Sequence, residues 1–428
     1  TMLKKFKIFH LAAVVGLSLS TLSAHSVSAS TNAREVLETY ANIALAKFQD
    51  SLSTAKALDS AIDNLISNPN ESTLNAAKSA WIEARVPYQQ TEVYRFGNAI
   101  VDDWEGRVNA WPLDEGLIDY VDESYGSESD ENSLYTVNVI ANTSLTVNGR
   151  TVDASVITPT LLSDTLHEAE EVEANVATGY HAIEFLLWGQ DLNGTGMGEG
   201  ARQATDYSIT NCSGGNCERR AEYLKAASNL LLFDLEEMVD NWKDSGAARV
   251  SLMQNEQAGL VAILTGMGSL SYGELAGERM KLGLLLNDPE EEHDCFADNT
   301  HNSHYFDQIG IRNVYSGHYK RFDGTVVMGP SIGDLVEEVD ADLHAELTSK
   351  LNETVNAMAA MKARAESIEA YDQMIGEGNV AGNAVVQAAI DSLVAQTRPI
   401  ERAVAALGLG IIEIEGSDSL DNPNAVFQ

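Results

Sequence analysis

The chain reads Gly179-Tyr-His-Ala-Ile-Glu-Phe-Leu-Leu-Trp-Gly189 near its middle, an apolar run that holds one histidine and one carboxylate. Residues three apart on a helix share a face, so His181 and Glu184 are predicted to project together. The run is too apolar for a solvated helix, and a buried imidazole and carboxylate need partners. Two kinds of partner stay open here: a divalent metal ion, or a hydrogen-bond network to Arg, Tyr or another helix.

Two metal-protease motifs are excluded by the residues present. The H-E-x-x-H motif would need a histidine at position 171, after His167 and Glu168, but that residue is Glu171. The H-x-x-E-H motif would need a histidine at position 185, which is Phe185. The sequence therefore shows no complete hydrolytic zinc site.

Helical periodicity extends away from the run in both directions. Apolar residues recur three and four apart from Thr31 until Asn68-Pro69-Asn70 stops the pattern. A second helix is predicted from about Ser72, and Pro87 is predicted to end or kink it. Further helices are predicted over residues 161–173, 223–238 and 260–286, and from residue 332 to about residue 371.

Two short hairpin signals interrupt the helices. Asn148-Gly149 and Asp323-Gly324 each lie between two segments of alternating pattern. Each half of the chain thus reads as helices, a hairpin and more helices, which suggests an internal duplication. The predicted fold is all-α, with two related antiparallel four-helix bundles and small β-hairpin insertions. The first bundle, residues 30–205, carries the H-x-x-E motif, and the second covers residues 206–428.

The first 29 residues have the pattern of a secretory signal peptide. Lysines at positions 4, 5 and 7 precede an apolar run over residues 11–22, and Val27-Ser28-Ala29 offers a small-residue cleavage site. No later segment has the uninterrupted apolar length that a membrane span needs. We therefore predict a periplasmic or otherwise exported protein, cleaved after Ala29, with no transmembrane segment in the mature chain.

The chain is strongly acidic, with a formal net charge of −37 from 27 basic and 64 acidic residues. Such a surface repels nucleic acid and anionic membrane and concentrates cations around itself. The composition therefore excludes nucleic acid as a partner. Solubility in a salty habitat is an equally good reason for the acidity.

The chain has three cysteines. Cys212 and Cys217 are close enough in sequence to close a small disulfide loop in an oxidising compartment. A zinc clip is less favoured, because the sequence has no second cysteine pair. Cys295 is predicted to stay unpaired.

The densest set of metal-ligating residue types follows the helix predicted over residues 260–286. Residues 289–304 offer carboxylates, three imidazoles and a thiol. A solvated acidic loop is the alternative, but the apolar Cys295 and Phe296 in mid-run favour a structured loop. The candidate residues of this second polar site are Glu278, Glu291, Glu292, His293, Asp298 and His301.

Together these pieces resemble the imelysin-like family, most closely its iron-regulated protein A branch. The matching motifs span nearly the whole mature chain: Gly179-x-His181-x-x-Glu184, Trp81…Arg85…Glu92-x-x-Arg95, Trp111-Pro-Leu-Asp-Glu-Gly116, Glu291-Glu-His-Asp-Cys-Phe296 and Asp298-Asn-Thr-His301. The resemblance implies two related four-helix bundles, an exported location, and G-x-H-x-x-E at a site between or beside the bundles. It also implies an association with bacterial iron acquisition.

We expect a metal ion at His181 and Glu184, with Glu92 and Asp114 as the favoured additional carboxylates. Di-iron bundles use Glu-x-x-His with further Glu residues, and here that spacing is kept with the order reversed. Iron is the favoured metal and zinc the alternative. The expected partners are the metal ion or an iron-linked ligand, together with outer-membrane or periplasmic components of iron uptake.

Two other functions stay open. The family name implies a metallopeptidase, which would need a complete metal site with a water and an adjacent base. The third hypothesis is an interaction module in which His181 and Glu184 are purely structural.

Overall fold

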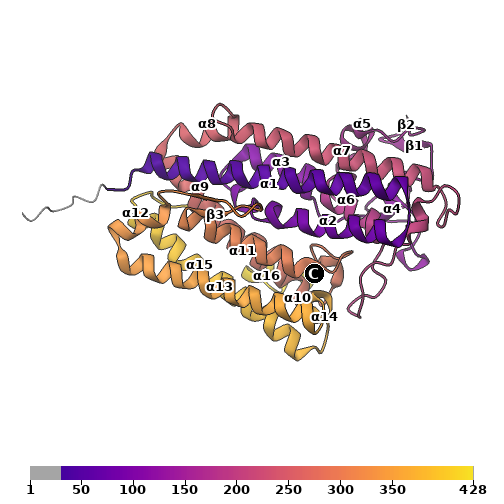
Figure 1. The fold of residues 1–428 in the computed structure, drawn as a ribbon. Helices are drawn as coiled ribbons and strands as arrows, with labels where there is room; N and C mark the ends of the chain where they lie inside the picture. Colours follow the sequence, from indigo (N-terminus) through magenta and orange to yellow (C-terminus); the bar gives the residue numbers. More distant parts are fainter. Residues whose placement is uncertain (1–29, 428) are drawn as a thin grey trace, which may run out of the picture. The chain divides into compact units, whose positions relative to one another are not determined.

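The computed structural model describes residues 30–427, and the described residues from Thr31 onward form one compact unit. The predicted signal peptide, residues 1–29, lies outside the described residues. The α-helices are α1 (Ala33–Ser67), α2 (Glu71–Gln89), α3 (Ala99–Asn109), α4 (Glu115–Ile118), α5 (Pro159–Leu161), α6 (Gly179–Trp188), α7 (Cys217–Trp242), α8 (Ala247–Met253), α9 (Glu256–Ser269), α10 (Leu282–Leu286), α11 (Thr300–Ser316), α12 (Ile332–Val339), α13 (Ala341–Ser367), α14 (Tyr371–Ile375), α15 (Val380–Ala406) and α16 (Asp418–Asp421). The strands are β1 (Ser144–Val147), β2 (Arg150–Asp153), β3 (His318–Lys320) and β4 (Val326–Met328). The chain is therefore mostly helical, as predicted (Figure 1).

The long helix α1 holds the first group of helices together. Its buried stripe is unbroken over the 35 residues between two capping asparagines. Asn32 accepts a hydrogen bond from Arg34 N at the start, and the helix ends at Asn68, as the sequence predicts. Both α2 and α7 pack along α1, and Figure 1 shows all three running side by side.

The second group of helices centres on α13. It packs against α11 and α15, and α15 packs in turn against a π-helix, Leu270–Lys281. The π-helix continues α9 directly and runs into α10, so residues 256–286 form one helical segment. The predicted helix over residues 260–286 is confirmed, but its wide π turns have no signal in the sequence.

The single helix predicted from residue 332 to about residue 371 is wrong. The structure has two helices, α12 and α13, which meet at Asp340. Asp340 has φ −155°, and its side chain accepts a hydrogen bond from Leu343 N, so it caps the start of α13. Apolar residues recur on both sides of this break, and periodicity alone therefore does not reveal it.

Two smaller helix predictions need comment. Pro87 is predicted to end or kink its helix; it does not end α2, which runs on to Gln89, and the predicted kink stays a prediction. The prediction of one helix over residues 161–173 is wrong, because α5 passes into a π turn that ends at Leu166, and His167 then has an extended conformation. Glu168, Glu170 and Glu171 all have positive φ there, which no regular right-handed helix allows.

The predicted hairpins and the predicted disulfide are confirmed. β1 pairs with β2 around Asn148-Gly149, and β3 pairs with β4 around Asp323-Gly324. Cys212 and Cys217 form a disulfide. Cys295 is free and buried.

The two-bundle division of the chain and its duplication stay predictions. Helix α7, which follows the predicted boundary between residues 205 and 206, packs against α1 and α6. Over residues 30–427, no helix has both the length and the apolar character needed to cross a membrane.

Candidate metal centre

Helix α6 is buried along its whole length, as its apolar run predicts. It packs against α2, α3 and α7, and Trp81 Nε1 donates a hydrogen bond to the Tyr180 carbonyl oxygen at 2.9 Å. Its first residue, Gly179, has φ +83°, and a Cβ there would lie 2.4 Å from the Val108 carbonyl oxygen. Only glycine combines that φ with so close an approach, so Gly179 sets the place from which His181 projects.

His181 and Glu184 project together, as their spacing predicts. The Nδ1 atom of His181 lies 2.8 Å from Oε2 of Glu184, and both side chains are fully buried. The other Glu184 oxygen accepts a hydrogen bond from Ala297 N at 3.0 Å. Glu184 therefore holds the imidazole at Nδ1, while Nε2 of His181 has no hydrogen-bond partner among the described residues.

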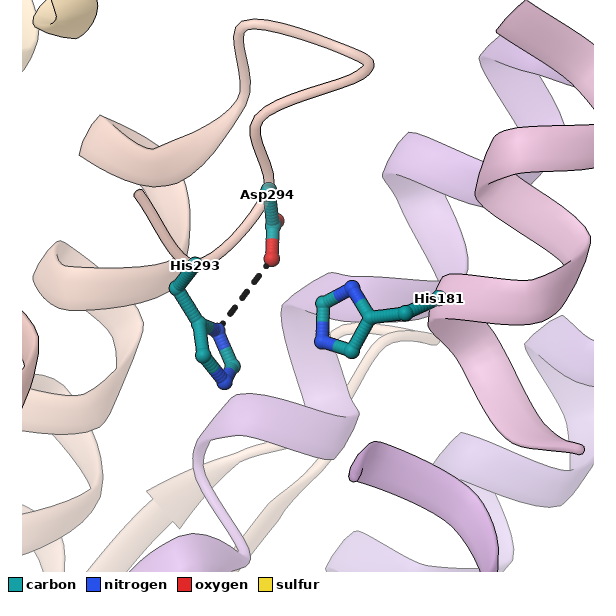
Figure 2. Close-up of side chains that lie close together, drawn as sticks. All are labelled: His181, His293 and Asp294. Atoms are coloured by element: carbon teal, nitrogen blue, oxygen red, sulfur yellow. Dashed lines mark ion pairs between the residues drawn. The ribbon is translucent and has the colours of Figure 1, made fainter. Parts of the chain in front are cut away.

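A loop from the second half of the chain brings His293 and Asp294 to His181, as Figure 2 shows. Ligand atoms of these three buried residues all lie within 4.8 Å of one another. The two imidazole ring centres are 4.8 Å apart in an edge-to-face arrangement. His293 Nδ1 lies 3.3 Å from Asp294 Oδ1. We refer to His181, His293 and Asp294 as the histidine cluster.

Arg85 from α2 neutralises the carboxylate of this cluster. Its Nη2 atom donates to Asp294 Oδ1 at 3.0 Å, and its Nη1 atom donates to Asn109 Oδ1 at 2.6 Å. Asn299 and Ser303 donate to the other Asp294 oxygen. Burial raises the pKa of Asp294, but the Arg85 guanidinium outweighs burial and holds that pKa well below its usual range. Asp294 is therefore ionised.

Both histidines are neutral near pH 7. Burial, followed by the charge of Arg85, lowers the pKa of His181 well below its usual range. Burial and the charge of Arg279 do the same to His293. Neutral imidazole is the form that binds metal ions, so the histidine cluster offers two ready nitrogen donors and one carboxylate.

A cavity of about 480 Å³ reaches the cluster at His293. Its lining also includes Arg279, Glu278 and Glu291. A small ligand in this cavity would therefore meet the histidine cluster from the side of His293.

Comparison with known proteins decides the family. The family model described as imelysin, peptidase M75, matches residues 44–400. The chain belongs to the imelysin family. The resemblance drawn from the sequence motifs is confirmed.

Individual relatives of this imelysin-family chain carry iron-related names. A segment of 64 residues is 36% identical to iron-regulated protein A of Synechococcus elongatus, covering 15% of this chain and only 18% of that protein. A crystal structure named as an iron-regulated protein A precursor, from Parabacteroides distasonis, aligns with a TM-score of 0.63 at 16% identity, covering 89% of this chain and 97% of that one. An imelysin-like protein from Psychrobacter arcticum aligns with a TM-score of 0.53 at 14% identity, covering 90% and 98%. At these identities the two structures show a shared fold.

The structure does not bring Glu92 into the histidine cluster of this imelysin-family chain. Glu92 is buried, accepts a hydrogen bond from Tyr88 Oη at 2.9 Å, and pairs with Arg279 at 2.6 Å and Arg95 at 3.3 Å. Burial raises its pKa, but Arg279 and Arg95 outweigh burial and lower it. Glu92 is therefore paired with two guanidinium groups and is not among the residues that gather with His181.

Asp114 also lies outside the histidine cluster. Its Oδ2 atom accepts a hydrogen bond from Asn132 Nδ2 at 2.7 Å, and burial raises its pKa. It occupies the N-cap position of α4. The sequence identifies Glu92 and Asp114 as available carboxylates, but which carboxylates converge is decided by helix packing.

The second polar site is divided by the fold. His293 joins His181, while Glu278 and Glu291 line the 480 Å³ cavity. Glu292 and Asp298 face a different group of carboxylates, described below. His301 is buried near Lys362, and burial followed by that charge lowers its pKa to about 4.

Sequence reasoning missed Asp294 as a cluster residue and Arg85 as its partner. Both lie in the quoted family motifs, 209 positions apart. The available signal was the pair His293-Asp294 directly before the apolar Cys295-Phe296, since charged groups in an apolar context are predicted to be buried and paired.

Proposed function

We propose that this imelysin-family protein binds a metal ion at the histidine cluster, with iron favoured and zinc the alternative, and serves bacterial iron acquisition after export. The observation that carries the proposal is the fully buried Nε2 of His181, which has no partner among the described residues. His181 also forms, with His293 and Asp294, a group whose ligand atoms all lie within 4.8 Å of one another. A buried polar atom without a partner costs about 1–3 kcal/mol, and a metal ion would supply the partner.

The donor set fits a first-row divalent ion. Imidazole suits iron and zinc, and a carboxylate adds negative charge. His181 and His293 would provide the nitrogens, and Asp294 the oxygen. Glu184 would then take the outer position, where a carboxylate on the far ring nitrogen fixes the orientation of a histidine ligand. This reassigns Glu184 from a ligand to a positioning residue.

Iron is favoured because two similar proteins are named for iron regulation. Those names describe the relatives, and the role in iron acquisition comes to this chain as part of the proposal. Outer-membrane or periplasmic components of iron uptake are the corresponding partners.

The test is a pair of measurements on the purified protein, calorimetric titration and thermal melting with Fe²⁺ and Zn²⁺. Metal should raise the melting temperature of the wild type, because it binds the folded state alone. His181→Ala should fold, keep the packing of α6, and lose this metal response. His344→Ala is the matched control, since His344 is half-buried, contacts Tyr315, and lies outside the cluster. An unchanged metal response in His181→Ala would end the ligand hypothesis.

A purely structural network is the second candidate. The 2.8 Å contact between His181 and Glu184, and the ion pair of Arg85 with Asp294, satisfy much of the cluster without a metal. In that case His181→Ala strands a buried partner and should melt early whether or not metal is added.

Peptidase activity is the third candidate. Glu184 is the nearest carboxylate to His181, but both of its oxygens are already bonded, which leaves no evident general base there. We expect no chelator-sensitive cleavage when the protein is incubated with unfolded polypeptides. Cleavage that stops on chelation and in His181→Ala would establish the peptidase.

A further inference from the structure

A second group of carboxylates gathers away from the histidine cluster. Oxygen atoms of Asp191, Asp298 and Asp372 all lie within 4.8 Å of one another. They come from three segments: the loop after α6, the loop before α11, and the first turn of α14. Like charges at this separation repel, so the carboxylates must either keep protons or bind a cation.

The most deeply buried member has no hydrogen bond to offset its burial. Asp372 is 0% exposed, and neither of its carboxylate oxygens has a hydrogen-bond partner among residues 30–427. Glu292 beside it is 1% exposed and equally without a partner at both oxygens. Buried carboxylates in folded proteins are paired or coordinate metals.

The strongest charges acting on this group are other carboxylates. Burial, then Asp372 and Asp191, raises the pKa of Asp298 to about 8. Burial and Asp191 raise the pKa of Asp372 to about 7, against a smaller opposing effect of the Gln373 backbone N–H. A divalent cation would remove the repulsion.

We propose that Asp191, Asp298 and Asp372 bind one calcium ion, with Glu292 as an adjacent fourth carboxylate. The donors are all oxygen, which suits hard cations rather than iron or zinc. Calcium takes six to eight oxygen ligands in flexible geometry. Asp191 and Asp298 are only half-buried, so water has access to complete the coordination.

The ion would join loops that carry the histidine cluster. Gly200 N already donates to Phe296 O at 2.9 Å, so the loop after α6 and the loop before α11 are in contact. Asp298 lies four positions after Asp294 in the same loop. Calcium would therefore stabilise the loop before α11, in which His293 and Asp294 lie close to His181.

The test is a Ca²⁺ titration of purified, chelator-treated protein at pH 8, followed by calorimetry and by thermal melting. The wild type should bind one Ca²⁺ and melt at a higher temperature with it. Asp372→Asn should lose affinity by about tenfold or more, since changes to residues behind a ligand already cost that much. Without calcium it should melt above the wild type, because a repelling charge has been removed. Asp164→Asn, an exposed carboxylate elsewhere, is the control.

The outcomes separate this site from the histidine cluster. Asp372→Asn should keep the wild-type response to Zn²⁺, and His181→Ala should keep the wild-type response to Ca²⁺. A calcium response in Asp372→Asn equal to that of the wild type would overturn the proposal. Mg²⁺ binding as tight as Ca²⁺ binding would overturn the choice of ion, because the small ion demands a regular octahedral site.

Discussion

Two residues outside the histidine cluster, Glu184 and Arg85, hold its side chains in position. Glu184 contacts His181 at Nδ1, and Arg85 contacts Asp294 at Oδ1. Neither residue needs to touch a metal to affect its binding. Each sets the ring orientation or the charge of a donor that would.

Glu184→Gln tests this division of roles. A glutamine keeps the size of the side chain, but it has one acceptor oxygen, whereas Glu184 uses one oxygen for His181 Nδ1 and the other for Ala297 N. We expect metal affinity to fall by about 10- to 100-fold, the usual effect of changing a residue behind a ligand. Calorimetry should still show the wild-type stoichiometry. A variant that binds no metal at all would make Glu184 a direct ligand instead.

Lys47 provides a pH-dependent prediction away from the cluster. It is fully buried, donates to the Gln90 carbonyl oxygen at 2.9 Å, and lies over the Tyr94 ring. Burial lowers its pKa well below the usual value, so the folded state releases a proton that the unfolded state keeps. The free energy of unfolding should therefore rise with pH in the alkaline range, until the unfolded lysine also titrates.

The measurement compares wild type with Lys47→Met in urea at a series of pH values from 7 to 10. The wild type should gain stability relative to the variant by at most about 1.4 kcal/mol per pH unit. Lys243→Met, at an exposed ion pair, is the control. A constant difference between wild type and Lys47→Met would show that Lys47 keeps its proton in the fold.

At the scale of secondary-structure elements, the residue at which helix α6 begins determines where His181 lies. Helix α6 begins at Gly179, whose φ of +83° and closeness to Val108 leave no room for a side chain. The glycine of the G-x-H-x-x-E motif therefore allows α6 to pack closely against α3. It affects metal binding only because it determines the position of His181.

Gly179→Ala should destabilise the fold by about 3 kcal/mol or more, since it adds backbone strain and a clash with α3. Gly378→Ala is a matched control, because Gly378 has φ +78° and nothing within 4 Å of an added Cβ. That control should lose only about 1–2 kcal/mol, the cost of positive φ alone. Urea unfolding of both variants gives the comparison, and equal losses would mean that the contact with Val108 relaxes freely.

The sequence predicted the positions of helix ends and hairpins better than it predicted the site. Caps and turn signals are local, so Asn68, Asn148-Gly149 and Asp323-Gly324 locate the end of α1 and both hairpins correctly. Asp340 shows the limit, because a capping break that preserves the apolar pattern is hidden from periodicity.

The composition of the candidate site could be predicted only in part. His181 and Glu184 are one helical turn apart, so their contact follows from local geometry. His293 reaches them from 112 positions away, and Glu92 is taken by Arg279 from 187 positions away. Such pairings depend on how helices pack, which no short pattern records.

At the scale of the whole molecule, charge is the dominant feature. The chain carries 64 acidic and 27 basic residues. Repulsion among the excess negative charges therefore destabilises the folded state. Raising NaCl from about 0.01 M to about 1 M shortens the Debye length from about 30 Å to about 3 Å. The melting temperature should therefore rise by several degrees in NaCl with a chelator present. A neutral solute at matched osmolality is the control, and a melting temperature that falls with salt would contradict the prediction.

The residues of the histidine cluster and their partners are far apart in sequence, and this separation has a consequence for how the protein folds during synthesis. Arg85 and Asp294 are 209 residues apart, so the cluster closes only after the chain has formed its long-range contacts. Such contacts carry the largest loop-closure cost and form slowly. A growing chain that has passed His181 but has not reached His293 holds one residue of the cluster and no site. If the cluster binds a metal ion as proposed, binding would require the finished fold, and a nascent chain would not load the ion too early.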